Sequence, residues 1–186
     1  DLINTPAGDL GPAELEAVAR DLAEAARAVG IPIIFTTYDY DPADPPTPHE
    51  RKCEPTIGPE HAGLMELDPR LGRREDERVI RKKYASAFKS TNLYENLTTL
   101  GVDTLIVTGV STSHCVYATA RDAAHTFRVV VPQQAVGERC ELLHEVNMLD
   151  IDIDLGEVPH GIAMIVRERG RLVETFELYI VNCLYT

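Results

Sequence analysis

The sequence lacks any block rich in lysine or arginine. Its 186 residues carry 18 Lys and Arg against 30 Asp and Glu, which gives a formal net charge of −12. Nucleic acids and anionic membrane surfaces attract proteins that present a basic face. Both are therefore excluded as expected partners.

Long apolar runs and a recognisable leader are also missing. No stretch of the sequence approaches the roughly 18 consecutive apolar residues of a membrane-spanning helix. The chain also does not open with a basic segment followed by an apolar one, which is the pattern of a secretion signal. The expected location is therefore the cytoplasm. A length of 186 residues with 44% hydrophobic residues predicts one well-buried domain over residues 1–186.

Closely paired cysteines are the third absence. The four cysteines, Cys53, Cys115, Cys140 and Cys183, contain no C-x-x-C pair, so a zinc site or a dithiol redox site is not expected. Disulfides are not expected either, because the sequence carries no secretion signal. Each cysteine is then either a small buried residue or a reactive thiol.

What the sequence does contain is an alternation of helix-like and strand-like segments. Apolar residues at helical spacing predict helices over residues 12–29, 92–101, 114–126, 137–150 and 160–170. Short apolar runs rich in β-branched residues predict strands over residues 31–38, 77–83, 103–110, 127–132 and 153–158. This alternation predicts an α/β fold, a three-layer α/β/α arrangement around a central, mainly parallel sheet.

Two segments do not follow the alternation. The Pro-rich residues 41–60 predict a long surface loop of the kind that often covers a site. The last residues, 171–186, favour either a pair of strands or an arm that packs on a partner subunit.

In such a fold the chemistry lies at the carboxyl ends of the strands. The junctions that follow the predicted strands, together with the start of the chain, supply an acid, two lysines, a hydroxyl-rich turn with a cysteine, and further polar residues: Asp1, Asn4, Tyr38, Asp39, Lys82, Lys83, Ser111–Cys115, Gln133, Gln134 and Arg139. Cys115 is the most prominent of them, because it follows the strongest predicted strand and opens an Ala-rich helix.

A thiol with an ordinary pKa of about 8.5 is mostly protonated at neutral pH, and only its thiolate attacks well. A helix N-terminus and an ammonium group would stabilise the thiolate, and a carboxylate would accept the proton. Lys82 and Asp1 are the candidates for these groups, although Lys82 can equally be a solvated charge and Asp1 a surface acid. His114 is disfavoured as the base, because adjacent residues at a helix start point in different directions.

Three separated segments resemble one known family. They are "DLIN" (1–4), "VIRKKYASAF" (79–88) and "VTGVSTSHCVYATARDA" (107–123). In this order they resemble the opening D-x-x-N motif, the lysine-bearing strand and the nucleophile segment of the isochorismatase-like cysteine hydrolases. The runs "NLYENLTTLGVDTLIVTG", "VGER" and "MLDIDIDLGEV" further resemble the N-carbamoylsarcosine amidase group of that family.

The resemblance implies a cofactor-free amidohydrolase that cleaves a small carbamoyl or amide compound through a thioester and releases ammonia. It implies Cys115 as nucleophile, Asp1 as general base and Lys82 as the positive partner of the thiolate. The N–H groups of Ser111 and Cys115 would form the oxyanion hole, beside a non-proline cis peptide at Val110–Ser111. The implied substrate-binding residues are Arg139, Asn4 and Val110, and the implied assembly is a homo-oligomer, either a dimer or a tetramer.

Other interpretations remain open at this stage. Arg139 can instead form a structural ion pair with Glu138 or Glu141. The function can instead be that of a maleamate-, biuret- or nicotinamide-type amidase, or of a catalytically silent binding module of the same fold.

Three further features show how far the resemblance extends. The family's first strand, which would end in the catalytic Asp, is absent before Asp1, so we expect the native chain to extend further. Residues 171–186 lie outside the resemblance and are expected to be a C-terminal extension. Asp39 and Asp41 have no histidine at the Asp-x-His spacing of the nicotinamidase metal site, so no metal is predicted.

Overall fold

The computed structural model describes residues 12–39, 41, 43–53, 66–159 and 176–182. Its α-helices are α1 (Pro12–Ala28), α2 (Pro48–Cys53), α3 (Leu93–Thr99), α4 (Tyr117–Ala123) and α5 (Glu141–Asp150). Its strands are β1 (Ile33–Tyr38), β2 (Arg78–Lys82), β3 (Val102–Val110), β4 (Arg128–Val130), β5 (Val136–Gly137) and β6 (Phe176–Asn182). Short 3₁₀ turns occur at Pro69–Leu71 and Gln133–Ala135, and π-helical turns at Thr112–Val116 and Ile151–Leu155.

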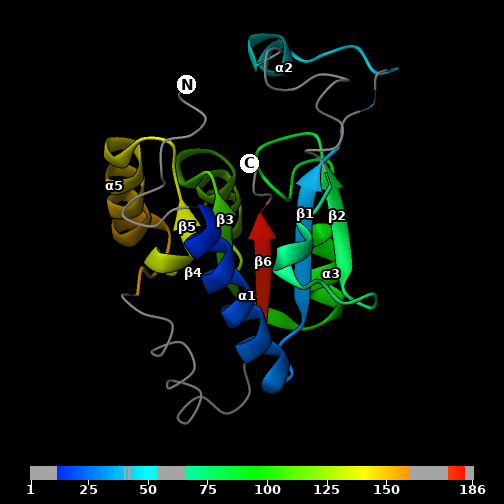
Figure 1. The fold of residues 1–186 in the computed structure, drawn as a ribbon, viewed down its shortest axis with the longest axis vertical. Coiled ribbons are helices and arrows are strands. Elements are labelled where there is room, and N and C mark those ends of the chain that lie inside the picture. Colours follow the sequence, from blue (N-terminus) through cyan, green and yellow to red (C-terminus); the bar gives the residue numbers. More distant parts are fainter. Residues whose placement is uncertain (1–11, 40, 42, 54–65, 160–175, 183–186) are drawn as a thin grey trace.

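The strands form one parallel sheet. Its order is β2-β1-β6-β3-β4, with β5 paired to the end of β3, and every strand pair is parallel. The carboxyl ends of β1, β2, β3 and β6 therefore meet at one edge, which is the upper edge in Figure 1. This is the edge at which the sequence predicts the functional residues.

Side chains alternate across the sheet and so build two cores. Ile34 and Leu105 belong to the core cluster that contains buried residues of α3 and α4. Their chain neighbours Phe35 and Ile106 belong to the second cluster, with the buried residues of α1, which crosses one face of the sheet in Figure 1. Strands covered on both faces read as continuous apolar runs. The predicted three-layer α/β/α fold is confirmed.

The predicted loop at 41–60 is wrong in part, because residues 48–53 form α2. Thr47 and Glu50 cap this helix reciprocally. The Glu50 N–H donates to Thr47 Oγ1 at 3.1 Å, and the Thr47 N–H donates to the Glu50 carboxylate at 2.6 Å. Pro48 occupies the first helical position, where its missing N–H costs nothing. These caps let a short helix form in a Pro-rich segment.

The predicted strand at 153–158 is also wrong. Residues 151–155 instead continue α5 as a π-helical turn, and the one β-type contact there is an isolated bridge between Glu157 and Val130. Ile151 is fully buried, and Met148, three residues earlier, packs in the same cluster. That helical spacing prevails over the β-branched composition. The predicted helix at 160–170 lies outside the described residues.

The tail of the chain contributes the central strand of the sheet. β6 lies between β1 and β3, with Tyr179 in register with Ile33 on one side and Ile106 on the other. This differs both from a strand pair and from an arm on a partner subunit. At the carboxyl edge, Asn182 of β6 is in register with Gly109 of β3.

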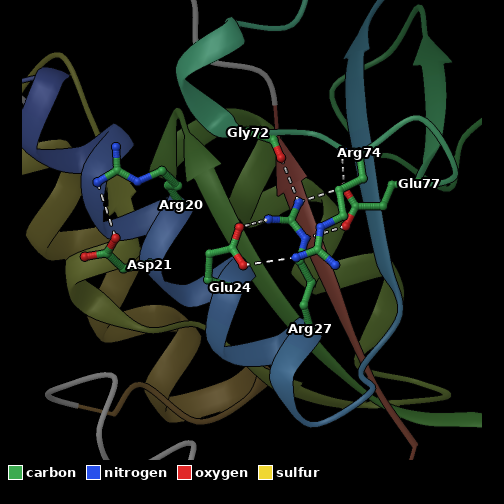
Figure 2. A network of polar contacts seen from close by, with 7 residues as sticks. All are labelled: Arg20, Asp21, Glu24, Arg27, Gly72, Arg74 and Glu77. Atoms are coloured by element: carbon green, nitrogen blue, oxygen red, sulfur yellow. Dashed lines mark hydrogen bonds and ion pairs between the residues drawn. The ribbon is translucent and has the colours of Figure 1, made fainter.

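The opposite edge of the sheet is closed by charged side chains. Arg27, at the end of α1, donates through Nε and Nη2 to both oxygens of Glu77 at 2.6 and 2.7 Å. It also donates to Glu24 and to the Gly72 carbonyl (Figure 2). This network ties α1 to the turn that leads into β2.

Candidate active site

Lys82 ends β2 with its side chain inside the protein. The burial of β2 alternates, so that Ile80 and Lys82 face the interior while Arg81 is exposed. Lys82 is 2% exposed, and its Nζ lies 3.2 Å from the Sγ of Cys115. The same ammonium donates to the Tyr84 carbonyl at 3.2 Å and to the Ala85 carbonyl at 2.9 Å. A buried cation and a thiol are thus in direct contact.

The neighbouring lysine points elsewhere. Lys83 forms an ion pair with Asp44 at 2.9 Å, on the segment that leads to α2. Of the two adjacent lysines at this strand end, Lys82 therefore contacts the thiol and Lys83 holds the segment above the sheet edge.

Cys115 lies in the turn that joins β3 to α4. It is 3% exposed and lies within the π-helical turn Thr112–Val116, directly before α4. The chain reaches this turn through Gly109, whose φ of +105° is a conformation that disfavours a side chain. A cis peptide follows between Val110 and Ser111. The cis peptide bond that the family resemblance implies at this position is confirmed.

Hydrogen bonds link the turn that follows Lys82 to helix α4. Ser86 Oγ donates to the Asp122 carboxylate at 2.5 Å, and the Ala87 N–H donates to Thr119 Oγ1 at 3.1 Å. Ser86 and Ala87 follow Lys82 in the chain, whereas Thr119 and Asp122 belong to α4. These bonds fix the position of Lys82 relative to Cys115.

The hydroxyl-rich residues before Cys115 are held from β5 and α5. Glu138 is fully buried, and its carboxylate accepts from Ser111 Oγ at 3.1 Å and from the Ser113 N–H at 2.7 Å. Between them, Thr112 Oγ1 donates to the Gly137 carbonyl at 2.9 Å and lies 3.0 Å from His144 Nδ1. Since the hydroxyl has one proton, His144 must carry its proton on Nδ1 and donate it to Thr112.

Arg139 forms the structural ion pair that the sequence left open. Its Nη1 lies 3.1 Å from a Glu138 oxygen, and its own N–H donates to the same oxygen at 2.8 Å. Its side chain is 54% exposed, so part of the guanidinium still faces solvent.

A pair of stacked histidines joins α2 to the π-helical turn Thr112–Val116. The rings of His49 and His114 lie 5.0 Å apart and nearly parallel. Tyr38, at the end of β1, donates to Glu50 and holds α2 from below. In Figure 1, α2 lies beyond the carboxyl ends of β1 and β2.

His114 is unsuited to accept the thiol proton. Burial, together with the neighbouring His49, Lys82 and Arg139, lowers the pKa of His114 to about 4. A neutral imidazole of such low basicity is a poor acceptor at neutral pH. This agrees with the sequence argument that disfavoured His114 as the base.

The structure brings together only some of the predicted site residues. Lys82, Cys115, Val110, Ser111 and Arg139 lie at one edge of the sheet. Asp1 and Asn4 fall outside the described residues, as does Cys183, and Cys140 is exposed. In the described part of the chain, no group of three or more His, Cys, Asp or Glu side chains could hold a metal ion.

Sequence reasoning missed the roles of Glu138, His49 and His144. Glu138 resembles a surface acid in the run "VGER", and nothing local marks it as buried. For His49 a signal did exist, since Thr47-Pro48 with Glu50 is a capping pattern that predicts a helix start.

Among the described residues, no helix is both long enough and apolar enough to cross a membrane.

The carboxyl edge of the parallel sheet thus presents the buried Cys115 thiol against the buried Lys82 ammonium. The isochorismatase domain matches residues 11–158, and the chain belongs to that family. The chain is 37% identical over 142 residues to an N-carbamoylsarcosine amidase of an Arthrobacter species, covering 73% of this chain and 54% of that protein.

One further curated relative and one solved structure are also similar to this chain. A maleamate amidohydrolase of Pseudomonas putida is 47% identical over 83 residues, which cover 44% of this chain and 39% of that protein. The chain thus spans about half or less of the length of these two curated relatives. The solved structure of a cysteine hydrolase from Pseudomonas syringae matches with a TM-score of 0.75 at 22% identity, over 90% of this chain and 92% of that chain. At this identity the match shows the fold alone.

Proposed function

We propose that this protein is an amidohydrolase that cleaves the C–N bond of a small carbamoyl or amide compound through Cys115. The observation that carries the proposal is the 3.2 Å contact between Lys82 Nζ and Cys115 Sγ, with both side chains buried. An ammonium held against a sulfur favours its thiolate, which is the nucleophilic form. The names of the two curated relatives, an N-carbamoylsarcosine amidase and a maleamate amidohydrolase, support an amide substrate.

The proposed reaction has two halves. Asp1 takes the thiol proton, and the Cys115 thiolate attacks the carbonyl carbon of the substrate. The oxyanion that forms is received by the N–H groups of Ser111 and Cys115. As the C–N bond breaks, the proton passes from Asp1 to the departing nitrogen, which leaves as ammonia or an amine. Water then hydrolyses the thioester and restores the thiol.

The most specific form of the proposal is a ureido acid such as N-carbamoylsarcosine as substrate. Arg139 can contribute to its recognition, because a guanidinium that is 54% exposed at the site edge retains donors for a carboxylate. Asn4 and Val110 complete the proposed substrate contacts. Maleamate is the second candidate substrate, supported by the 47% identity to the maleamate amidohydrolase over 83 residues.

Ammonia release from a panel of N-carbamoylsarcosine, other ureido acids, maleamate, biuret and nicotinamide tests the proposal. The wild type is expected to release ammonia from at least one of them, and Cys115→Ala is expected to abolish the release without unfolding the protein. Cys140→Ser is the matched control, because Cys140 is an exposed thiol outside the site. A folded wild type that releases no ammonia from the panel favours a silent binding module instead.

A further inference from the structure

Ser111, Thr112 and Ser113, which precede His114 and Cys115, are each held by residues of the segment 137–144. Glu138 holds Ser111 and Ser113, whereas the Gly137 carbonyl and His144 hold Thr112. A chain segment carrying a cis peptide bond and the proposed oxyanion donor is thus tied to β5 and α5 through side chains. The Glu138 carboxylate accepts two of these hydrogen bonds, whereas Gly137 and His144 each make one.

We propose that Glu138 is a positioning residue for the reaction, whose carboxylate fixes the Ser111–Ser113 turn so that the Ser111 and Cys115 N–H groups stay aimed at the reacting carbonyl. The inference rests on the proposed function, because it assigns the turn its role in receiving the oxyanion. Glu138 itself does not touch the substrate in this proposal and acts through the backbone of the turn.

Only a carboxylate satisfies all the groups that face Glu138. One oxygen accepts from Ser111 Oγ and from the Arg139 N–H and Nη1, and the other accepts from the Ser113 N–H at 2.7 Å. A glutamine in the same place would turn its NH₂ toward a donor in either orientation, since N–H groups of Arg139 and of Ser113 lie on the two sides. An unmatched donor pair in a buried site would push the turn away from its present position.

The protonation state of Glu138 agrees with this role. Burial on its own would raise the pKa of the carboxyl group, but hydrogen bonds from Ser113 and Arg139 and the Arg139 charge outweigh it and lower the pKa below the usual range. Glu138 is therefore an acceptor at both oxygens throughout the neutral range. Glu138 thus remains an anion that binds N–H groups. A group that exchanges protons during the reaction would need a pKa nearer to neutral.

The test compares Glu138→Gln with Glu141→Gln, an isosteric change at an exposed acid three residues away. Glu138→Gln is expected to lower kcat about tenfold or more while KM stays within about threefold, because loss of a whole oxyanion donor costs about 100-fold or more in kcat. Glu141→Gln is expected to leave both constants unchanged.

Hydrogen–deuterium exchange of the 107–117 segment supplies a measurement that needs no turnover. Faster exchange there in Glu138→Gln, with a thermal unfolding transition that remains cooperative, supports the proposal. Unchanged kcat, a change confined to KM, or unchanged exchange would each overturn it. A wild type inactive on every substrate would refute the proposed function instead, and the exchange result would still decide whether Glu138 positions the turn.

Discussion

Two cations with largely buried side chains lie near opposite ends of β2 and have different partners. Arg27 has a side chain that is 6% exposed and grips both oxygens of Glu77, with Glu24 as a second carboxylate (Figure 2). Lys82, at the other end, contacts two backbone carbonyls and the Cys115 thiol, and within the described part of the chain it has no ion pair. The first arrangement stabilises the fold, because the charge is balanced and the donors are used.

Among the described residues, Lys82 has no such balancing carboxylate. Its partners are neutral, and in the proposed function its contact with the Cys115 thiol is the one that bears on the reaction. The comparison therefore separates a cation that is paired with carboxylates from a cation that contacts the proposed nucleophile. Variants at the two positions should affect different measurements.

The largest expected effect is on catalysis. Lys82→Met keeps an unbranched apolar stem in the buried position but removes the ammonium from Cys115. We expect ammonia release to fall about 1,000-fold, which corresponds to about 4 kcal/mol of transition-state stabilisation. Lys83→Met is the matched control, because Lys83 pairs with Asp44 instead, and it should retain activity within about twofold. Equal losses in the two variants would contradict the assignment of Lys82.

The next effect is on stability and leaves the chemistry untouched. Arg27→Met leaves the largely buried Glu77 carboxylate without its guanidinium partner. We therefore expect the free energy of unfolding to fall by about 3 kcal/mol. The value lies at the low end for a broken buried pair, because the Arg74 N–H still donates to Glu77 at 2.7 Å. Chemical denaturation measures the change, and Arg20→Met on the same helix, with an exposed Asp21 partner, is the control. Loss of activity in the folded Arg27→Met protein would erase the distinction between the two cations.

The parts of the fold and of the candidate site differ in how far the sequence predicts them. The strand-end positions of Lys82 and Cys115 are predictable from local patterns, but the choice of Lys82 over Lys83 depends on the family resemblance. Glu138 is not predictable from such patterns, since its burial depends on Ser111 and Ser113 arriving from another part of the sheet. The position of β6 in the middle of the sheet depends on pairing with β1 and β3, which the composition of residues 171–186 does not encode. The prolines of residues 41–60 favour a loop, although the local capping residues Thr47 and Glu50 support the helix α2.

A smaller effect, on KM, is expected where α2 contacts the turn Thr112–Val116. His49→Ala removes the ring that stacks on His114 at 5.0 Å, and a stacked aromatic pair contributes about 1 kcal/mol beyond its buried area. We expect KM to rise about fivefold, since α2 loses one of its contacts with the site edge. His49→Phe should restore it, and His125→Ala, an exposed histidine, should change nothing. A KM that stays constant in His49→Ala would mean that α2 does not shape the substrate site.

The smallest effect uses His114 as a reporter of the charge that Lys82 leaves uncompensated. Burial comes first among the causes that lower the pKa of His114 to about 4, and the charges of His49, Lys82 and Arg139 add to it. Removing the Lys82 charge should raise this pKa, although burial and the other two charges keep it below the value of an exposed histidine. The titration of the His114 ring protons, followed by NMR in Lys82→Met, measures the change. Arg27→Met should leave that titration where it is, because the Arg27 charge is balanced by Glu77 at the far edge of the sheet. If both variants shifted the His114 titration equally, the charge of Arg27 would also reach the carboxyl edge, and balanced and unbalanced cations would not be distinguishable by their fields.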